Sequence, residues 1–281
     1  MTEAAGPRAV SWSELRFASP LVKVMTVTCD LRRSGPSLTY YVDRTWVGLP
    51  LSGLFTVHAR DDEHLVHQAL GVVFPQGLEY RMSHPTDDGD TAVTLGFEPG
   101  IIEEAVSTTL ERVRVTRLDV RMRYALGLLL AAARRGDDAA LLVEVLALDL
   151  LRSIAAGIAP ERQCSTSPVA RAKVDRVRAL LAERPADHWT LPSVARLVGY
   201  SPFHLARQFR AHTGVSVHRY LTDLRVAAAL GRIEAGDPSV ATIAADLGFS
   251  HHSHLTATLR GRLGLTPRAI RERLGQPRRD P

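Results

Sequence analysis

The first hundred residues carry short runs of β-branched and aromatic residues, interrupted at regular intervals by turn-forming residues. Such runs indicate strands, and they cover residues 22–31, 38–47, 53–58, 69–73, 79–83 and 91–97. The turn sequences between them are Ser34-Gly35-Pro36, Gly48-Leu49-Pro50, Pro75-Gln76-Gly77 and Asp87-Asp88-Gly89-Asp90. This spacing is typical of an antiparallel barrel or sandwich, so we expect a small β-barrel over residues 1–100.

After residue 100 the apolar positions recur at helical spacing. Residues 101–158 contain two wide apolar stripes, one through Val120, Tyr124 and Leu128 and one through Leu142, Val145, Leu146 and Ile154. Stripes this wide can pack on the barrel with one side and on a second copy of the chain with the other. We therefore predict a helical dimerisation segment and a homodimer, with an intramolecular helical hairpin as the alternative. Residues 159–169 have loop composition and predict a linker.

The C-terminal part contains an internal repeat, which predicts one structural unit used twice. The stretch VARLVGYS at 194–201 matches IAADLGFS at 243–250, 49 residues later. Beyond it the offset becomes 50, where Leu205, Phe209 and Gly214 match Leu255, Leu259 and Gly264. Each copy has the pattern of a short helix, a turn at a glycine followed by an aromatic residue, and a second helix. This is the pattern of a helix-turn-helix.

Capping residues mark the turn and the second helix of each copy. Gly199 and Gly248 permit the positive φ of a tight turn. Ser201 and Ser250 are placed to accept a backbone N–H of the following helix, and Pro202 suits the first helical position. The glycines Gly214 and Gly264 end the two second helices.

Helical geometry then assigns the outward faces of the two second helices. With Leu205 and Phe209 facing the core, the first helix presents Phe203, Ala206, Arg207 and Arg210. With Leu255 and Leu259 facing the core, the second presents Ser253, Thr256, Ala257 and Arg260, with His251 and His252 at its N-terminal end. Residues 218–234 read as one connecting helix of roughly 25 Å, long enough to hold two such helices along one face of a duplex.

Charge is divided unevenly along the chain. Residues 1–165 hold 17 Lys and Arg against 21 Asp and Glu, whereas residues 166–281 hold 18 against 9. The basic part favours nucleic acid or a membrane surface as partner, although a solvated basic face without a partner has the same composition. The helix-turn-helix repeat decides in favour of double-stranded DNA.

Other features bound the class of protein. Residues 1–10 lack the basic start and apolar core of a signal peptide, and the longest apolar run, residues 124–133, is well short of the roughly 20 residues that cross a bilayer. We expect a cytoplasmic protein with no membrane partner. Cys29 and Cys164 fit neither a disulfide framework nor a CxxC metal knuckle, so we expect unpaired thiols.

Residues 170–275 resemble the DNA-binding domain of the AraC/XylS family of transcription regulators. The resemblance rests on LPSVARLVGYSPFHLARQFRAHTG, YLTDLRVAAAL and IAADLGFSHHSHLTATLRGRLGLTPRAIR, whose GFS followed by G-x-TP is highly specific. It implies base contacts by Phe203, Ala206, Arg207, His252, Ser253, Thr256 and Ala257, and phosphate contacts by Ser201, Arg210, Ser250 and Arg260. Arginine can bond both acceptors of a guanine edge, so Arg207 is the foremost base-reading candidate, with a phosphate contact as its alternative.

Four positions depart from the family pattern. Ala257 stands where many members have arginine, and Leu255 and Leu259 stand where aromatics are common. Val217 replaces the proline usual after the first unit, whereas Pro267 keeps it. The changes at Ala257, Leu255 and Leu259 argue against strong base reading by the second unit.

The N-terminal half, particularly GVVFPQGLEYRMSH, resembles the cupin-type effector-binding barrel of the same family. We take Tyr40, Trp46, His58, Tyr80 and His84 as candidate residues of an effector pocket. The histidines His58, His64, His67 and His84 raise the rival hypothesis of a metal-dependent cupin enzyme. The His-x-His pair of such enzymes is missing, and residues three apart on a strand face opposite sides. We therefore expect no enzymatic activity, no bound metal and no cofactor. The adjacent histidines His251, His252 and His254 also lack metal-ligand spacing.

The expected fold is α+β, with a cupin-like β-barrel, a helical dimerisation segment and an all-α double helix-turn-helix domain. The expected function is sequence-specific transcription regulation, as an activator more than a repressor, through promoter DNA and RNA polymerase and under a small-molecule effector. The alternatives are a ligand-free regulator with a purely dimerising barrel and a metal-dependent cupin enzyme.

Overall fold

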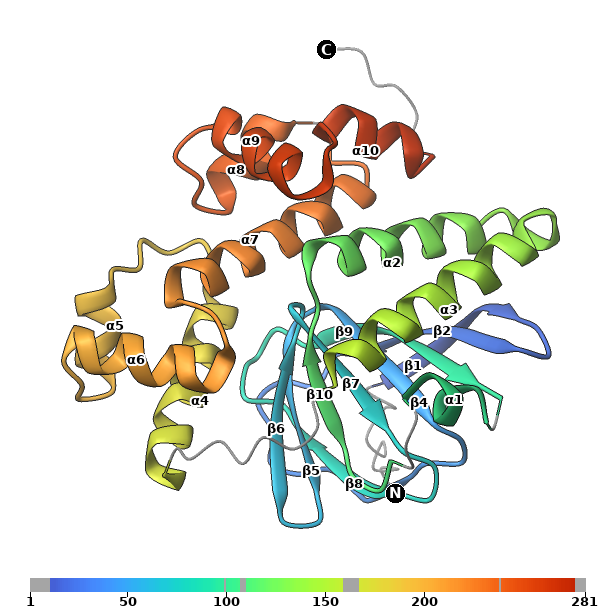
Figure 1. Ribbon diagram of the computed structural model, residues 1–281, viewed down its shortest axis with the longest axis horizontal. Coiled ribbons are helices and arrows are strands. Elements are labelled where there is room, and N and C mark those ends of the chain that lie inside the picture. Colours follow the sequence, from blue (N-terminus) through green and yellow to red (C-terminus); the bar gives the residue numbers. More distant parts are fainter. Residues whose placement is uncertain (1–10, 99, 107–109, 159–166, 238, 276–281) are drawn as a thin grey trace, which may run out of the picture. The chain divides into compact units, whose positions relative to one another are not determined.

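The computed structural model describes residues 11–98, 100–106, 110–158, 167–237 and 239–275 (Figure 1). Cys164, Pro238 and most of the expected linker at 159–169 lie outside these residues. The chain divides into two compact units. One contains Met1–Thr116 and Ala132–Ala155, and the other contains Arg117–Ala131 and Ala156–Pro281. The expected α+β class is confirmed, with antiparallel sheets followed by a helical region.

Two antiparallel sheets form the N-terminal unit. The first has six strands in the order β1-β2-β9-β4-β7-β10, and the second has four in the order β3-β8-β5-β6. The strands are β1 (Ser11–Ala18), β2 (Val22–Cys29), β3 (Tyr40–Tyr41), β4 (Trp46–Ser52), β5 (Leu54–Ala59), β6 (Asp62–His67), β7 (Leu70–Phe74), β8 (Glu79–Ser83), β9 (Asp90–Phe97) and β10 (Arg114–Arg117). One buried cluster joins the sheets, with Phe55, Val57 and Val66 from the second packing against Val72 and Phe74 of the first.

Three strands are additional to those expected from the sequence: β1, β6 and β10. All three lie at sheet edges. Their sequences, SWSELRFA, DEHLVH and RVTR, are rich in charged and polar residues. Charge on an edge strand discourages pairing with another chain, and it also hides the strand from a search for apolar alternation.

One expected turn is wrong. Gly48-Leu49-Pro50 lies inside β4, where Leu49 is fully buried and Pro50 pairs with Ala92 of β9. A register shift between Pro50 and Ser52 accommodates the proline, which has no N–H to donate. The expected strand at 38–47 is instead broken into β3 and the start of β4. Asp43 lies in the break, and its carboxylate accepts a hydrogen bond of 3.0 Å from Trp46 Nε1.

Helices complete the N-terminal unit: α1 (Ile101–Val106), the short 3-10 helix η1 (Gly136–Ala139) and α3 (Ala140–Gly157). Helix α3 buries Val143, Ala147, Leu150 and Ile154 on one side. On another side Leu141, Leu142 and Val145 are exposed.

The helical unit contains α4 (Pro168–Glu183), α5 (Leu191–Leu197), α6 (Pro202–Thr213), α7 (Val217–Glu234), α8 (Val240–Asp246), α9 (His252–Leu263) and α10 (Pro267–Arg273). Helix α2 (Val120–Ala133) belongs to it as far as Ala131. Val120 and Tyr124 of α2 are buried in one cluster with Leu230, Ile243 and Leu259. The apolar stripe through Val120, Tyr124 and Leu128 is therefore occupied within the unit and is not open to a second copy.

No helix in the described ranges is both long enough and apolar enough to span a bilayer.

Candidate nucleic-acid interface

The first helix-turn-helix is formed by α5 and α6. Thr190 caps α5 through a reciprocal pair of hydrogen bonds with Ser193, at 3.2 and 3.1 Å. Gly199 turns the chain with φ of 65°, and Ser201 then caps α6 by accepting the His204 N–H at 3.2 Å. Helix α6 ends at Gly214 in the left-handed conformation. The caps expected at Ser201 and Gly214 are thus confirmed.

The outward face of α6 follows from what the helix buries. Leu205 and Phe209 are fully buried, and Phe209 meets the Tyr220 ring edge-on at 5.3 Å. On the opposite side Phe203 is 79% exposed, and Arg207 is exposed one turn further on. The face opposite the core therefore carries an aromatic ring and a cation, both accessible to solvent.

Arginines on this face are available to a partner. Arg207 and Arg210 are exposed, and neither side chain makes a hydrogen bond or ion pair with any residue that the structure describes. Ala206 lies half-buried beside Arg207, and Ser201 is exposed at the start of the helix.

The second helix-turn-helix repeats the geometry in α8 and α9. Gly248 turns the chain with φ of 73°, and Gly264 ends α9 in the left-handed conformation. Helices α6 and α9 are both 12 residues long, and α5 and α8 are both 7. The repeat extends into the next helix of each copy, since Ser216 caps α7 and Thr266 caps α10 in the same way.

The expected cap at Ser250 is wrong. The residue at the N-terminal cap of α9 is His251, and its side chain makes no capping bond. Ser250 Oγ is instead hydrogen-bonded to His254 Nδ1 at 3.2 Å. The change of offset from 49 to 50 between the two copies is one inserted residue at this point, and it moves the cap from the serine to the histidine.

The outward face of α9 is less basic than that of α6. His252, Ser253, Ala257 and Arg260 are exposed, and Thr256 is half-buried. Leu255 and Leu259 are fully buried, as their helical positions require. At the offset of 50, Arg260 corresponds to Arg210, but Ala257 corresponds to Arg207. The second helix therefore lacks the central cation of the first.

Helix α7 connects the two copies and sets their separation. Its 18 residues make roughly 27 Å of helix. Arg225 on α7 donates to the carbonyls of Pro185 at 2.7 Å, Asp187 at 2.9 Å and Gly248 at 2.8 Å. One guanidinium thus ties the loop before α5 to the turn of the second copy.

An ionic network anchors the first copy to α4 and α7. Asp175 accepts a hydrogen bond from Arg178 at 2.5 Å and lies 3.4 Å from His212 Nε2 on α6, and Arg178 Nε donates to the Tyr220 hydroxyl at 3.2 Å. Burial on its own raises the pKa of Asp175, but the His212 hydrogen bond and the charge of Arg178 outweigh it, so the pKa is lowered. In the second copy Arg262 of α9 pairs with the buried Asp223 of α7.

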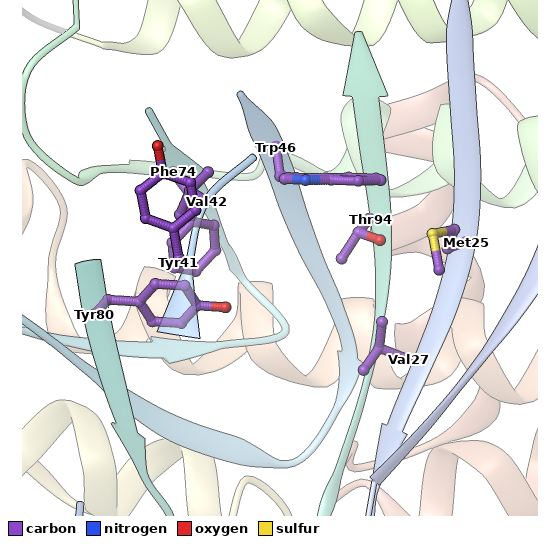
Figure 2. Close-up of a pocket in the computed structure, with 8 residues that line it drawn as sticks. All are labelled: Met25, Val27, Tyr41, Val42, Trp46, Phe74, Tyr80 and Thr94. Carbon is purple, nitrogen blue, oxygen red and sulfur yellow. The ribbon is translucent and has the colours of Figure 1, made fainter. Parts of the chain in front are cut away.

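A cavity of about 220 Å³ lies between the two sheets of the N-terminal unit. Figure 2 shows the rings of Tyr41, Phe74 and Tyr80 on one side, with Met25, Val27 and Thr94 on the other. Val42 and Trp46 complete the lining, which contains no charged side chain. Burial, with a smaller contribution from Tyr40, raises the pKa of Tyr80 to about 12, so its hydroxyl stays neutral.

Of the five residues expected in an effector pocket, Trp46 and Tyr80 line this cavity. Tyr40 is not among the lining residues but packs against Tyr80, with ring centroids 5.4 Å apart. His58 contacts Glu63 at 3.0 Å and Ser83 at 2.7 Å, and His84 lies 2.9 Å from Asp90. The sequence analysis missed Met25, Val27 and Thr94, which face the interior as Trp46 does. Alternation along each strand is the signal that could have found them.

The other two histidines considered for a cupin metal site, His64 and His67, lie on one strand. His64 and His67 lie on β6, where they pair with Val57 and Leu54 of β5, and only His67 is fully buried. His67 Nδ1 accepts the N–H of Ala69 at 3.2 Å.

A family model described as a helix-turn-helix domain matches residues 194–273, from within α5 to the end of α10. The HTH-type transcriptional activator RhaS of Salmonella schwarzengrund is 34% identical over 101 residues, which are 36% of this chain and 36% of that protein. The HTH-type transcriptional regulator GlxA of Rhizobium meliloti is 31% identical over 119 residues, 42% of this chain and 36% of that protein. The chain thus spans little more than a third of the length of these relatives.

Two solved structures are similar at low scores. Apo ToxT from Vibrio cholerae is 10% identical with a TM-score of 0.38, covering 90% of this chain and 97% of that one. A transcriptional regulator from Chromobacterium violaceum, described as an AraC-type DNA-binding domain-containing protein, is 25% identical with a TM-score of 0.36, covering 40% of this chain and 100% of that one.

Proposed function

Because the helix-turn-helix unit of this chain belongs to the AraC/XylS family of transcription regulators, we propose that the whole protein regulates transcription by binding specific promoter sequences. The observation that carries the proposal is the pair of outward faces on α6 and α9. Each is the second helix of its helix-turn-helix. Each exposes side chains on its outward face and fully buries the apolar side chains on its inward face. Such helices enter the major groove.

Base reading falls mainly to α6. Phe203 can contact a thymine methyl group, and Arg207 can bond both acceptors of a guanine. Ala206 allows the helix to approach the bases closely. In α9 the readers are His252, Ser253, Thr256 and Ala257, which offer weaker contacts. Ser201, Arg210, Ser250 and Arg260 lie at helix ends, where contacts to phosphate position the protein without reading sequence.

The cavity between the sheets is the proposed effector site, and its lining defines the kind of effector. Aromatic and aliphatic side chains surround the cavity, and Tyr41, Tyr80 and Thr94 bring the hydroxyl groups of its lining. An ionised ligand would lose its hydration there without gaining a counter-charge. We propose a small, uncharged and largely apolar effector, since the cavity is below the roughly 300–1,000 Å³ of sites for drug-sized ligands.

Dimerisation is proposed through α3. Leu141, Leu142 and Val145 lie within two turns and are exposed, which is costly for a protein that remains a monomer. A dimer would present two pairs of helix-turn-helix units, one pair to each of two neighbouring half-sites. We propose that the dimer acts in the cytoplasm as an activator that contacts RNA polymerase.

Binding-site selection tests the proposed function. The full chain, mixed with a library of random duplexes, should enrich a defined motif within a few rounds. A matched variant, Phe203→Ala with Arg207→Ala, should retain weak binding that falls with salt but enrich no motif or a shortened one, because both residues are exposed and their loss leaves the fold intact. Equal recovery of all sequences by the wild-type chain would contradict the proposal.

A further inference from the structure

Three potential metal ligands meet inside the β-sheet unit, outside the effector cavity. They are Cys29 at the end of β2, Asp90 at the start of β9 and His84 just after β8. Their exposed fractions are 7%, 7% and 3%, so all three are buried. The thiol sulfur, one imidazole nitrogen and one carboxylate oxygen all lie within 4.8 Å of one another.

The backbone brings these side chains together from three segments. Cys29 and Asp90 are direct cross-strand partners in the β2–β9 ladder, so they project from the same face of the first sheet. His84 comes from the second sheet and is held by two backbone hydrogen bonds with Ser34, at 3.0 and 3.2 Å. Its Nδ1 lies 3.5 Å from Ser34 Oγ, which leaves Nε2 directed at Asp90.

Two of the buried polar atoms have no hydrogen-bond partner among the described residues. His84 Nε2 and Asp90 Oδ1 are 2.9 Å apart, close enough for an ion pair, yet neither atom makes a hydrogen bond of acceptable geometry. A buried polar atom without a hydrogen bond is costly, and such atoms are rare in folded proteins. Two buried ligand atoms this close, with a thiol beside them, can bind one cation in common.

The surrounding backbone leaves the site little freedom to rearrange. Gly89 has φ of 66°, and a Cβ at this position would lie 2.5 Å from the carbonyl oxygen of Cys29. A Cβ on Gly53 would lie 2.6 Å from the Cα of Asp90. Only glycine fits both positions, so the turn before β9 holds Asp90 against the end of β2. A metal site needs ligands that are positioned before the ion arrives.

We propose that Cys29, His84 and Asp90 bind one divalent transition-metal ion, for which Zn²⁺ is the best fit. Thiolate, imidazole and carboxylate are the ligands of zinc sites, whereas Mg²⁺ and Ca²⁺ prefer oxygen alone. Three protein ligands leave a fourth position for water. Burial raises the pKa of the Cys29 thiol, and the charges of Asp90 and Asp30 add to this. A cation would supply the positive charge that lets thiolate and carboxylate lie side by side.

The site would connect the metal to the effector cavity through the β2–β9 ladder. Met25 pairs with Thr94, Val27 with Ala92 and Cys29 with Asp90, and alternation places all three pairs on the same face. Met25, Val27 and Thr94 line the cavity. The metal would therefore stabilise one end of the β2–β9 strand pair, and the middle of the same pair lines the proposed effector cavity.

Cobalt titration of the full chain tests the proposal. After chelator treatment, Co²⁺ should produce a thiolate-to-cobalt charge-transfer band that saturates at one ion per chain and disappears when Zn²⁺ is added. Cys29→Ser should abolish the band, and Asp90→Asn should weaken Co²⁺ binding by about tenfold or more. The matched controls Cys164→Ser and His58→Gln should keep it, because one removes the other thiol and one removes a histidine that also faces a carboxylate.

The proposal is overturned if the wild-type chain gives no such band, or if the band survives in Cys29→Ser. A measurement on the wild-type chain avoids dependence on the folding of any variant. X-ray absorption of the zinc-loaded chain should show one sulfur at about 2.3 Å and nitrogen or oxygen ligands at about 2.0–2.2 Å. A zinc coordination shell without sulfur would also overturn the assignment, because Cys29 would then not be a ligand of the ion.

Discussion

Arg207 and Ala257 occupy corresponding positions on α6 and α9, and this single difference makes the two helix-turn-helix units unequal. An arginine that reaches a guanine edge contributes to the choice of sequence, whereas an alanine can only permit close approach or touch a thymine methyl. Arg210 and Arg260 are the same in both copies and lie one turn further toward the helix end. We infer that α6 dominates sequence choice and that both helices contribute phosphate contacts.

Replacing Arg207 by Ala should weaken binding to the best operator by roughly 1–3 kcal/mol and relax the preference at one or two base pairs. Replacing Arg260 by Ala should weaken all sequences about equally and lower the slope of log affinity against log salt by about 1. Arg210→Ala is the matched control and should behave as Arg260→Ala does. Binding-site selection at several salt concentrations measures both effects. An unchanged motif for Arg207→Ala together with an altered motif for Arg260→Ala would reverse the assignment.

At the scale of single residues, the sequence predicted side chains whose positions follow from helical periodicity. It did not predict clusters that form only when distant segments meet in the folded chain. Leu205 and Phe209 had to face inward, so the exposure of Phe203 and Arg207 followed. Cys29 is far from His84 and Asp90 in the sequence, and the three side chains meet through a strand ladder and a bridge, which no local spacing reveals. The expectation of no bound metal rested on the spacing of histidines along the sequence and did not consider Cys29 or Asp90 as partners of His84.

At the scale of elements, Arg225 is the residue that couples the two copies of the helix-turn-helix. Its guanidinium donates hydrogen bonds to three carbonyls, two in the loop before α5 and one in the turn before α9. Hydrogen bonds to a charged donor contribute more than neutral ones, and the carbonyls would lose their partner together. The connection between copies therefore depends on α7 and on this side chain.

Arg225→Met keeps most of the volume of the side chain and removes all three donors. Amide hydrogen exchange of the full chain should become faster in residues 184–190 and 243–250, with opening free energies lower by about 2 kcal/mol. Arg171→Met, a change at an exposed arginine on α4, should leave both segments unaffected. Faster exchange in only one segment, or in neither, would show that Arg225 does not couple the copies.

Helices and strands could be predicted where apolar and polar positions alternate in an amphipathic pattern. They could not be predicted where that pattern is absent. The helices of the repeat have strong caps and two-sided faces, and their bounds agree with the sequence to within a few residues. Strands β1, β6 and β10 are charged edge strands, and the β4 segment at Gly48 and Pro50 contains residues that usually end a strand. A neighbouring strand on each side overrides that local preference, because β4 lies between β9 and β7.

At the scale of the whole molecule, α3 offers the surface proposed for dimerisation. Leu142→Glu would place an unpaired carboxylate in an apolar interface, so we expect the dissociation constant of the dimer to rise by about 100-fold, or ~3 kcal/mol. Sedimentation velocity at micromolar concentration should show a wild-type dimer and a variant monomer. Leu38→Glu, at an exposed leucine away from α3, should remain a dimer. A monomeric wild-type chain would exclude this surface as a stable interface.

The sequence predicted part of the division of the chain into two units. The charge contrast and the repeat separated a basic helical region from the rest. The role of α2 was not visible, because its apolar stripe through Val120 and Tyr124 is equally suited to a partner chain and to the core that it joins. Periodicity shows that a face is buried and does not show by what.

Methylation interference on the selected DNA site is the measurement that tests the central claim most directly, because guanine N7 lies in the major groove. The claim is that α6 and α9, held apart by α7, enter successive major-groove segments on one face of the duplex. We predict two groups of sensitive guanines about one helical turn, roughly 10 base pairs, apart, with the stronger group losing its sensitivity in Arg207→Ala. A single group of sensitive guanines, or no sensitive guanine at all, would contradict it.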